Sequence, residues 1–503
     1  MELSQLASNL ALGFGVALTF QNLFWCFVGA VVGTAVGVLP GLGPVATMAL
    51  LLPVTYYLPA DGALIMLAGI YYGAQYGGST TAILVNLPGE SSSVVTCLDG
   101  YQMARQGRAG PALAIAAIGS FFAGCVSTLL IAVAAPPLTA LAQKFGPADY
   151  CSLMVFGLVT AIVMASGSVL KAVAMIFFGL LLGIVGTDVN TGNLRYDFGI
   201  GILFDGINFV PIAMGVFGIN EIMANLTNPE RRDVLSQKIT SLMPTWIDLK
   251  DSAGAILRGT ALGSLLGILP GGGALLSSFA SYSLEKKLSK TPEKFGTGMI
   301  QGVAGPESAN NAGAQTSFIP MLTLGIPSNA VMAMMLGGMM IHGIIPGPQV
   351  MTEKPGLFWG LIASMWVGNA MLIVFNLPMV GVWVKMLTVP YRLLSVTILF
   401  FCCIGVYSVN NSAEEVLLIT GFGVLGYALI KMGCEPAPML LGFILGPMME
   451  TYLRRAMLLS RGDPMVFLDR PLSLSFLIAA AVLLIIIMLP NIRKVRKQAF
   501  VEE

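Results

Sequence analysis

Charged residues are scarce in this chain. Only 10% of its 503 residues are Asp, Glu, Lys or Arg, whereas 56% are hydrophobic and the mean hydropathy is +0.83. Soluble domains carry about 25% charged residues, so this chain has too few to cover a surface in water. Its net charge of +1 also offers no basic field for nucleic acid, and we expect no nucleic-acid partner. The composition predicts a protein embedded in membrane lipid.

Residues that carry enzyme or metal chemistry are equally rare. The sequence has one histidine and seven cysteines, with no CxxC pair and no GxxxxGK[ST] phosphate-binding loop. These absences argue against zinc, disulfide and nucleotide-hydrolysing arrangements. An intramembrane enzyme would need a nucleophile with its base or a metal cluster, and neither pattern occurs. We therefore expect no enzymatic activity, no catalytic residue, no transition-metal site and no cofactor.

Long apolar runs take the place of polar surface. Stretches such as SFLIAAAVLLIIIML (475–489) are continuously apolar, whereas the strands of a membrane barrel alternate apolar and polar residues. Only helices and closed barrels satisfy their backbone inside lipid, so the spanning elements are helical. With about 20 residues needed for each crossing, the sequence predicts an all-α polytopic membrane protein. We expect about 12 transmembrane helices plus broken or re-entrant hairpins.

The distribution of basic residues predicts an orientation. No Lys or Arg precedes Arg105, and the chain ends with NIRKVRKQAFVEE. Because cytoplasmic segments are enriched in Lys and Arg, we expect a cytoplasmic C-terminus. The stretches LEKKLSKTPEK and METYLRRAMLLSRGD are interpreted as cytoplasmic as well. The first residues lack the basic region of a signal peptide, and the side of the N-terminus stays open.

Three short motifs occur twice in the same order. GVLPGLG (37–43) matches GILPGGG (267–273), and each follows a GTA triplet. Further along, GAQ occurs after both, and NLPG (86–89) then matches GIPS (325–328). Ordered matches with near-equal spacing indicate an internal repeat. We predict a first repeat half at 1–224, a polar connector at 225–252 and a second repeat half at 253–503.

The repeated LPG motif interrupts two apolar segments. Proline and glycine end a helix, and the freed peptide groups need protein or water partners at membrane depth. In secondary transporters, paired broken helices from two repeats mark the substrate site. We therefore predict that both breaks contribute to one binding site. The alternative is that each break is a tight loop at the membrane surface.

Neutral polar residues gather near both breaks. Their hydroxyls and amides suit carboxylate oxygens, so we assign substrate binding to Ser79, Thr80, Asn86, Ser91, Asn310, Asn311, Ser317 and Ser328. The carbonyls freed at the breaks suit Na⁺, so we assign ion binding to Pro40, Gly41, Gly43, Gly271, Gly273 and Thr323. An ionisable residue at membrane depth is costly, so it usually pairs with another group or has a function in transport. Glu307 is therefore the candidate for ion coupling. The alternatives are helix packing for the small polar residues and a position at a membrane mouth for Glu307.

Several of these stretches resemble a known family. GVLPGLGP, YGGSTTAILVNLPGESSS, LDGYQMARQGRAGPALAIA and the long stretch that begins GPESANNAGAQTSFIP resemble TctA, the large membrane subunit of tripartite tricarboxylate transporters. The family pattern falls on Pro40, Gly41, Gly43, Asn86, Pro88, Gly89, Pro306, Glu307, Asn310, Asn311, Pro320 and Pro327. On this basis Pro88, Gly89 and Pro327 join the candidate substrate residues.

The resemblance implies a multi-pass importer in the bacterial inner membrane. Its partners would be a small TctB-like membrane subunit and a periplasmic TctC-like solute-binding protein. It would take up citrate or a related carboxylate by alternating access, coupled to an ion gradient that is commonly Na⁺, and its repeats would be inverted. Glu90 departs from the family pattern, and an acid there would repel an anion unless it faces solvent or a cation. The remaining alternative is a passive carboxylate channel or a structural membrane subunit.

Overall fold

The computed structural model describes residues 3–39, 43–164, 168–188, 191–227, 242–269, 273–386 and 391–488. Helices dominate this part of the chain, and one small antiparallel sheet pairs β1 (Gly186–Thr187) with β2 (Leu194–Arg195). The predicted all-α class is therefore confirmed. The chain divides into two compact units, unit 1 (Met1–Thr139 and Glu221–Gly405) and unit 2 (Ala140–Asn220 and Val406–Glu503). These units are defined by contacts in space and the predicted halves by repeated sequence. The division therefore does not test the two halves, which remain a prediction.

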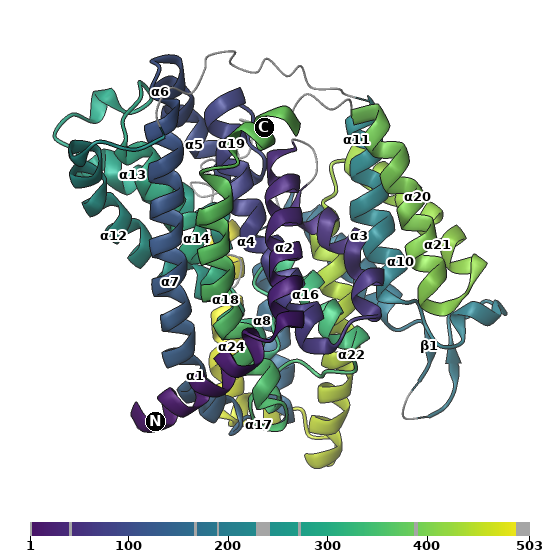
Figure 1. The fold of residues 1–503 in the computed structure, drawn as a ribbon. Helices are drawn as coiled ribbons and strands as arrows, with labels where there is room; N and C mark the ends of the chain where they lie inside the picture. Colours follow the sequence, from purple (N-terminus) through teal and green to yellow (C-terminus); the bar gives the residue numbers. More distant parts are fainter. Residues whose placement is uncertain are drawn as a thin grey trace. The chain divides into compact units, whose positions relative to one another are not determined.

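Unit 1 holds every segment that the repeated motifs single out. Its N-terminal segment comprises α1 (Leu3–Ala17), α2 (Phe20–Val38), α3 (Pro44–Tyr56), α4 (Ala60–Val85), η1 (Ser91–Ser93), α5 (Val94–Thr96), the π-helix η2 (Cys97–Tyr101), α6 (Gln102–Arg105) and most of α7 (Ala109–Ala142). Its second segment comprises most of α11 (Asn220–Thr227), α12 (Trp246–Ile268), α13 (Gly273–Leu288), η5 (Pro292–Lys294), α14 (Gln301–Thr316), α15 (Phe318–Leu324), α16 (Ala330–Ile341), α17 (Gln349–Glu353), α18 (Pro355–Asn376), α19 (Val380–Met386) and most of α20 (Tyr391–Asn410). The helices around the repeated motifs, among them α2, α3, α4, α12, α13 and α14, are labelled in Figure 1.

Unit 2 contains the small sheet and a second group of helices. They are α8 (Pro147–Met164), α9 (Val169–Gly183), η3 (Gly201–Leu203), α10 (Phe209–Ala213), the π-helix η4 (Met214–Ile219), α21 (Ala413–Lys431), α22 (Pro436–Leu459), α23 (Val466–Asp469) and α24 (Pro471–Met488). Helix α22 packs against both α8 and α9, and α24 packs against α8.

Several helices have the length and composition of membrane spans. Within the described ranges, four helices meet both criteria, namely α2, α7, α18 and α21. Other apolar helices are shorter, including α3, α9 and α16. On α7 the exposed side chains of Phe122, Val126, Leu129 and Val133 recur at the spacing of one helical face. Such an apolar face is stable against lipid but not against water. The predicted number of about 12 spans remains a prediction.

A ladder of glycines joins α2 to α4. Gly29, Gly33 and Gly37 follow one another at four-residue intervals, so all three lie on one face of α2. At each of them an added Cβ would overlap a backbone carbonyl oxygen of α4. The three carbonyls belong, in order, to Met66, Ile70 and Ala74. Because both residue series ascend together, α2 and α4 run parallel with their backbones in direct contact.

The same arrangement joins α12 to α14. Gly259, Gly263 and Gly267 face α14 at the same four-residue interval, and an added Cβ would again overlap a carbonyl oxygen at each position. The carbonyls here belong to Gly305, Ala309 and Gly313. Close approach through small residues is the usual way in which helices associate in lipid, where apolar side chains gain little by leaving the solvent.

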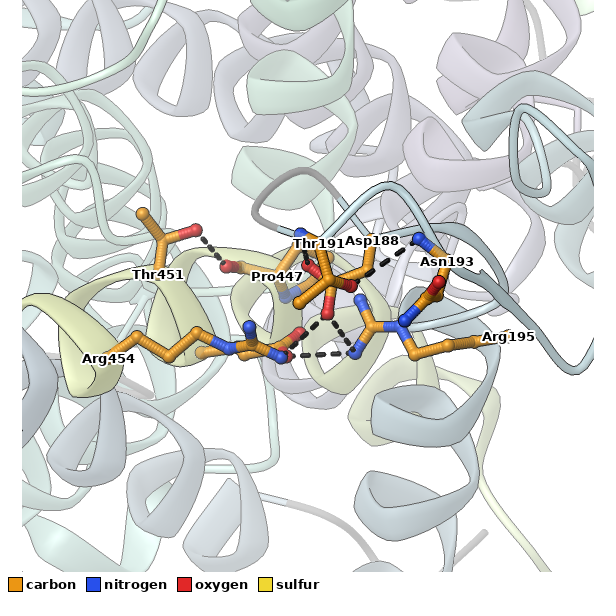
Figure 2. A network of polar contacts seen from close by, with 8 residues as sticks. Asp188, Thr191, Asn193, Arg195, Pro447, Thr451 and Arg454 are labelled. Atoms are coloured by element: carbon orange, nitrogen blue, oxygen red, sulfur yellow. Dashed lines mark hydrogen bonds and ion pairs between the residues drawn. The ribbon is translucent and has the colours of Figure 1, made fainter.

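Charged side chains in unit 2 fasten the sheet to α22 (Figure 2). Arg195 of β2 lies 2.8 Å from Glu450 of α22, and Arg454 contacts Glu450 at 2.7 Å and Asp188 at 2.9 Å. Asp188 follows β1 and is 5% exposed, so its charge depends on these arginines for compensation. The network fixes the connection between α9 and α10.

The ladder on α2 generates a stability prediction. Replacing Gly33 with Ala places a methyl group against the carbonyl of Ile70, so we expect Gly33→Ala to lower the free energy of unfolding by about 1–3 kcal/mol. Thermal unfolding of the detergent-purified protein measures the effect. Gly15 of α1 is the matched control, because an added Cβ there meets nothing within 4 Å. Equal melting temperatures for the two variants would contradict backbone contact between α2 and α4.

Candidate functional site

The two helix breaks lie between α2 and α3 and between α12 and α13. Pro40, Gly41 and Gly271 lie outside the described residues, so their assignment to ion binding stays a prediction. The flanks of both breaks are visible. Gly43 caps α3, whose first residue is Pro44, and Gly273 begins α13 with a positive φ of 46°.

A hydroxyl group approaches a carbonyl near each break. Thr81 of α4 donates to the carbonyl of Val38 at 2.8 Å, and Ser317 lies 3.4 Å from the carbonyl of Gly267. Each hydroxyl lies later in the same predicted repeat, on the segment that leads to the Pro-containing turn. A freed carbonyl at membrane depth costs several kcal/mol unless it is paired, and Thr81 meets this requirement at the first break. The single hydrogen of Ser317 is donated to the carbonyl of Gly313 at 2.7 Å, so its hydroxyl only approaches the carbonyl of Gly267.

The two repeated Pro-containing turns have the same backbone form. Helix α4 ends at Asn86, which is left-handed with φ 59°, and α15 ends at Gly325, which is left-handed with φ 73°. Four residues later, Glu90 caps η1 and Asn329 caps α16, both in extended conformation. Asn329 accepts a hydrogen bond from the backbone N–H of Met332 at 2.9 Å. The turns therefore correspond residue by residue, with an acid in one at the position of an amide in the other.

The helix after each break contacts the helical segment that follows the turn of the opposite half. Helix α3 packs against α16, and α13 packs against η1 and α5. Near the second break, a Cβ on Gly273 would lie 3.3 Å from the side-chain nitrogen of Asn329. Near the first, Gly89 packs so closely on Gly37 that a Cβ would overlap its carbonyl oxygen. The flanks of both breaks and both turns thus converge within unit 1.

Glu307 is the first of two acids at this convergence. It lies on α14, is 0% exposed, and accepts hydrogen bonds from the hydroxyls of Ser79 on α4 and Thr96 on α5. Among the described residues, none of the ion pairs includes Glu307. A buried carboxylate is costly unless a charge or several donors compensate it, so this acid at membrane depth is a functional candidate.

Glu90 is the second acid. Its carboxylate accepts from the hydroxyl of Ser92, and the amide nitrogen of Asn310 lies 3.4 Å away. Ser92 also lies 2.9 Å from the amide oxygen of Gln75. A hydroxyl has one hydrogen to donate, so both contacts are satisfied when Gln75 turns its amide to present the NH₂ group. Gln75, Ser92 and Glu90 then form a continuous chain of hydrogen bonds.

Two buried amides on α14 have unused atoms. In the described part of the chain, the side-chain oxygen of Asn310 and both polar atoms of Gln315 have no hydrogen-bond partner. Asn310 is 0% exposed and Gln315 is 1% exposed. Buried polar atoms are nearly always paired, so unpaired ones indicate a place for a ligand or for water.

The structure brings only some of the predicted residues together. Ser79, Asn310 and Glu307 contact the acid cluster, and Ser317 and Ser328 lie beside Asn329 at the second turn. Gly89 is buried against α2, and Pro327 is buried between Gly325 and Asn329. Asn86, Pro88 and Ser91 are solvent-exposed at the first turn.

Three other predicted residues point elsewhere or bind their own helix. Asn311 donates to Ser120 of α7 at 2.6 Å, and Thr323 donates to the carbonyl of Ile319 at 2.7 Å. Thr80 lies 3.4 Å from the carbonyl of Tyr76, and it lines a small pocket together with Ser79, Ser120 and Asn376. The assignment of these residues to substrate or ion remains a prediction.

Sequence reasoning missed two contributors. Thr96 donates to Glu307, and the hydroxyl of Tyr71 lies 3.3 Å from the amide nitrogen of Asn329. Tyr71, Gln75 and Ser79 recur every four residues on α4. That spacing places them on one helical face, which was a usable signal for Tyr71. Thr96 carried no such signal because η1 and α5 are too short for a periodic pattern.

The sequence model of a known family matches most of this chain. The match covers residues 23–441 and the family is described as the tripartite tricarboxylate transporter TctA family. The chain belongs to the TctA family. It is therefore a multi-pass membrane protein of a transport family and not an enzyme.

Two curated relatives of this TctA subunit come from Agrobacterium vitis. One, described as an uncharacterized 52.8 kDa protein in the TAR-I ttuC′ 3′ region, is 59% identical over 498 residues, which is 99% of each chain. The other, described as an uncharacterized protein in the TAR-II ttuC′ 3′ region, is 60% identical over 241 residues, which is 48% of this chain and 100% of that protein. No solved structure gives a significant match.

The left-handed conformation of Asn86 yields a test that separates backbone strain from ligand contact. A β-branched residue is strained in this region by roughly 1–2 kcal/mol, whereas glycine adopts it freely. We expect Asn86→Val to lower thermal stability and Asn86→Gly to preserve it. Exposure of Asn86 makes loss of core packing irrelevant. A valine variant as stable as the wild type would show that the turn does not hold this conformation. Reduced transport by the glycine variant would indicate a contact between the Asn86 side chain and the substrate.

Proposed function

We propose that this TctA subunit imports a tricarboxylate such as citrate, or a related carboxylate, by ion-coupled alternating access. Na⁺ is the proposed coupling ion, and Glu307 is the proposed coupling residue. The observation that carries the proposal is the convergence of the flanks of both breaks and both Pro-containing turns within unit 1. Buried hydroxyls and amides there offer the donors that a carboxylate needs. Family membership adds a small TctB-like subunit and a periplasmic TctC-like binding protein as proposed partners, in the bacterial inner membrane.

The two glycine ladders support the proposed pair of structural repeats. In both halves, the helix before the break runs parallel to the helix that leads to the Pro-containing turn. Helix α4 is continuous over 26 residues, long enough to cross once. If α4, α7, α8, α9 and the α10–η4 segment each cross once, α12 runs opposite to α2. This count favours inverted repeats, with one mobile bundle that carries both breaks.

The proposed orientation places the C-terminus in the cytoplasm. Helix α24 lies between Arg470 and the basic C-terminal stretch, so a crossing by α24 puts these two basic regions on opposite sides. Four residues of the NIRKVRKQ stretch are Lys or Arg and none is acidic, whereas Arg454 and Arg470 pair with carboxylates. We therefore assign METYLRRAMLLSRGD to the periplasmic side, in place of the cytoplasmic location expected from its arginines alone.

Uptake into proteoliposomes tests this function. The chain is reconstituted with its small subunit and binding protein, and the uptake of labelled citrate and of a panel of other di- and tricarboxylates is measured. We expect saturable accumulation that depends on an inward Na⁺ gradient. Uptake that persists without a Na⁺ or pH gradient would contradict ion coupling. Electrical conductance without saturation would favour the alternative, a passive carboxylate channel.

The unpartnered amide of Gln315 generates a second prediction. Because neither polar atom has a partner, replacing Gln315 with Met removes no hydrogen bond from the protein, and we expect unchanged or higher thermal stability. If the amide binds the transported ligand, uptake falls about tenfold or more, the equivalent of about 1.4 kcal/mol. Gln349→Met, at an exposed position on α17, is the control. Wild-type uptake by the Gln315 variant would remove this residue from the site.

A further inference from the structure

We propose that Glu90 and Glu307 together form a binding site for a hard monovalent cation, with Na⁺ as the ion, and that this site must fill before the carboxylate enters. The inference deepens the proposed function and rests on it. It places the cation between two acids, away from the glycines of the helix breaks to which the sequence assigned it.

Two links join the acids in space. On α4, Gly78 and Ser79 are neighbours in sequence, and Ser79 donates to Glu307 while a Cβ on Gly78 would lie 2.8 Å from Cγ of Glu90. On α14, Asn310 follows Glu307 by three residues and so shares its helical face. The amide of Asn310 reaches Glu90 at 3.4 Å. These two links place both carboxylates in one buried cluster.

The oxygen atoms around this pair suit a hard cation. Hydroxyls of Ser79, Thr96 and Ser92 touch the carboxylates, and all three are buried. A hydroxyl has lone pairs as well as a hydrogen, so it serves a cation as readily as a carboxylate. Carboxylate, hydroxyl and amide oxygens are the ligands that hard cations prefer, whereas no described group of three His, Cys, Asp or Glu residues could hold a transition metal.

An unused oxygen points to the ligand independently of the acids. The side-chain oxygen of Asn310 has no partner, and its own amide nitrogen lies beside Glu90. No donor among the described residues reaches this oxygen, so a cation that enters beside Asn310 would pair it. Asn310 is 0% exposed, which leaves bulk water unable to provide a donor. A cation between Glu90, Glu307 and Asn310 satisfies all three groups.

The need for release favours an alkali cation over a divalent ion. A coupling ion must be released on the far side of the membrane, and carboxylate-rich sites can hold Ca²⁺ at nanomolar affinity, while Mg²⁺ dehydrates reluctantly. Na⁺ is bound more weakly by the same oxygens because its charge is halved. The same charges set the order of binding. An anionic substrate meets two negative charges at the empty site, and one bound Na⁺ halves that charge, so cation binding precedes substrate binding.

The test measures Na⁺ binding to the full chain in lipid nanodiscs. The melting temperature is recorded as NaCl replaces choline chloride at constant ionic strength, because a ligand that binds only the folded state stabilises it in proportion to occupancy. We expect a saturable increase for the wild type. Glu90→Gln and Glu307→Gln should each raise the half-saturating Na⁺ concentration about tenfold or more. Glu293→Gln, an exposed acid on η5, should match the wild type.

Several outcomes would overturn the site. These are a wild type with no Na⁺-specific stabilisation, variants with unchanged Na⁺ dependence, or a stronger response to CaCl₂ than to NaCl. Glu90 is only partly buried, so its variant provides the test even if Glu307→Gln fails to fold. The uptake assay separates the two proposals. If both variants take up carboxylate like the wild type, with the same dependence on Na⁺, the cation site alone is refuted. If both variants lose Na⁺ binding but the wild type takes up no carboxylate, the transport function alone is refuted.

Discussion

The need to pair every peptide group inside lipid shapes this protein. A helix satisfies its own backbone, and a broken helix does not, so each break requires polar atoms from another segment. At the first break such an atom comes from Thr81, which donates to the carbonyl of Val38. Because Thr81 belongs to α4, which leads to the first Pro-containing turn, the pairing that stabilises this break also positions that turn.

The two turns are alike in backbone and different in charge. Asn86 and Gly325 both end a helix in the left-handed region, and Glu90 and Asn329 both begin the next one. A symmetric pair of turns would present equivalent groups to a ligand from both sides. The acid at one turn and the amide at the other give the proposed site a polarity, with a cation end and an anion end, that the repeat by itself does not supply.

The helical class and the location of the polar cluster could be predicted from the sequence, because composition and repeated motifs report directly on lipid contact and on chain breaks. The family could be predicted because several long stretches resemble it. Contacts between distant segments could not. The sequence places Glu307 beside Asn310 and Asn311 alike, yet Asn310 approaches Glu90 whereas Asn311 binds Ser120 on α7. Adjacent residues on a helix point about 100° apart, so only packing decides which one faces the site. Likewise, the sequence alone presents Glu90 as an acid that would repel an anion. Only the packing shows that Glu90 and Glu307 belong to one cluster, which suits a cation.

The glycine ladders have a mechanical consequence. Where backbones touch through glycines, no flexible side chains lie between the helices to absorb small shifts, and each carbonyl lies where the Cβ of the opposing glycine would be. Sliding α2 along α4 would move each carbonyl off its glycine until it reached the next one, a step of four residues or about 6 Å. Small displacements are therefore resisted. Each break moves as one rigid body with the turn that follows the helix packed against it.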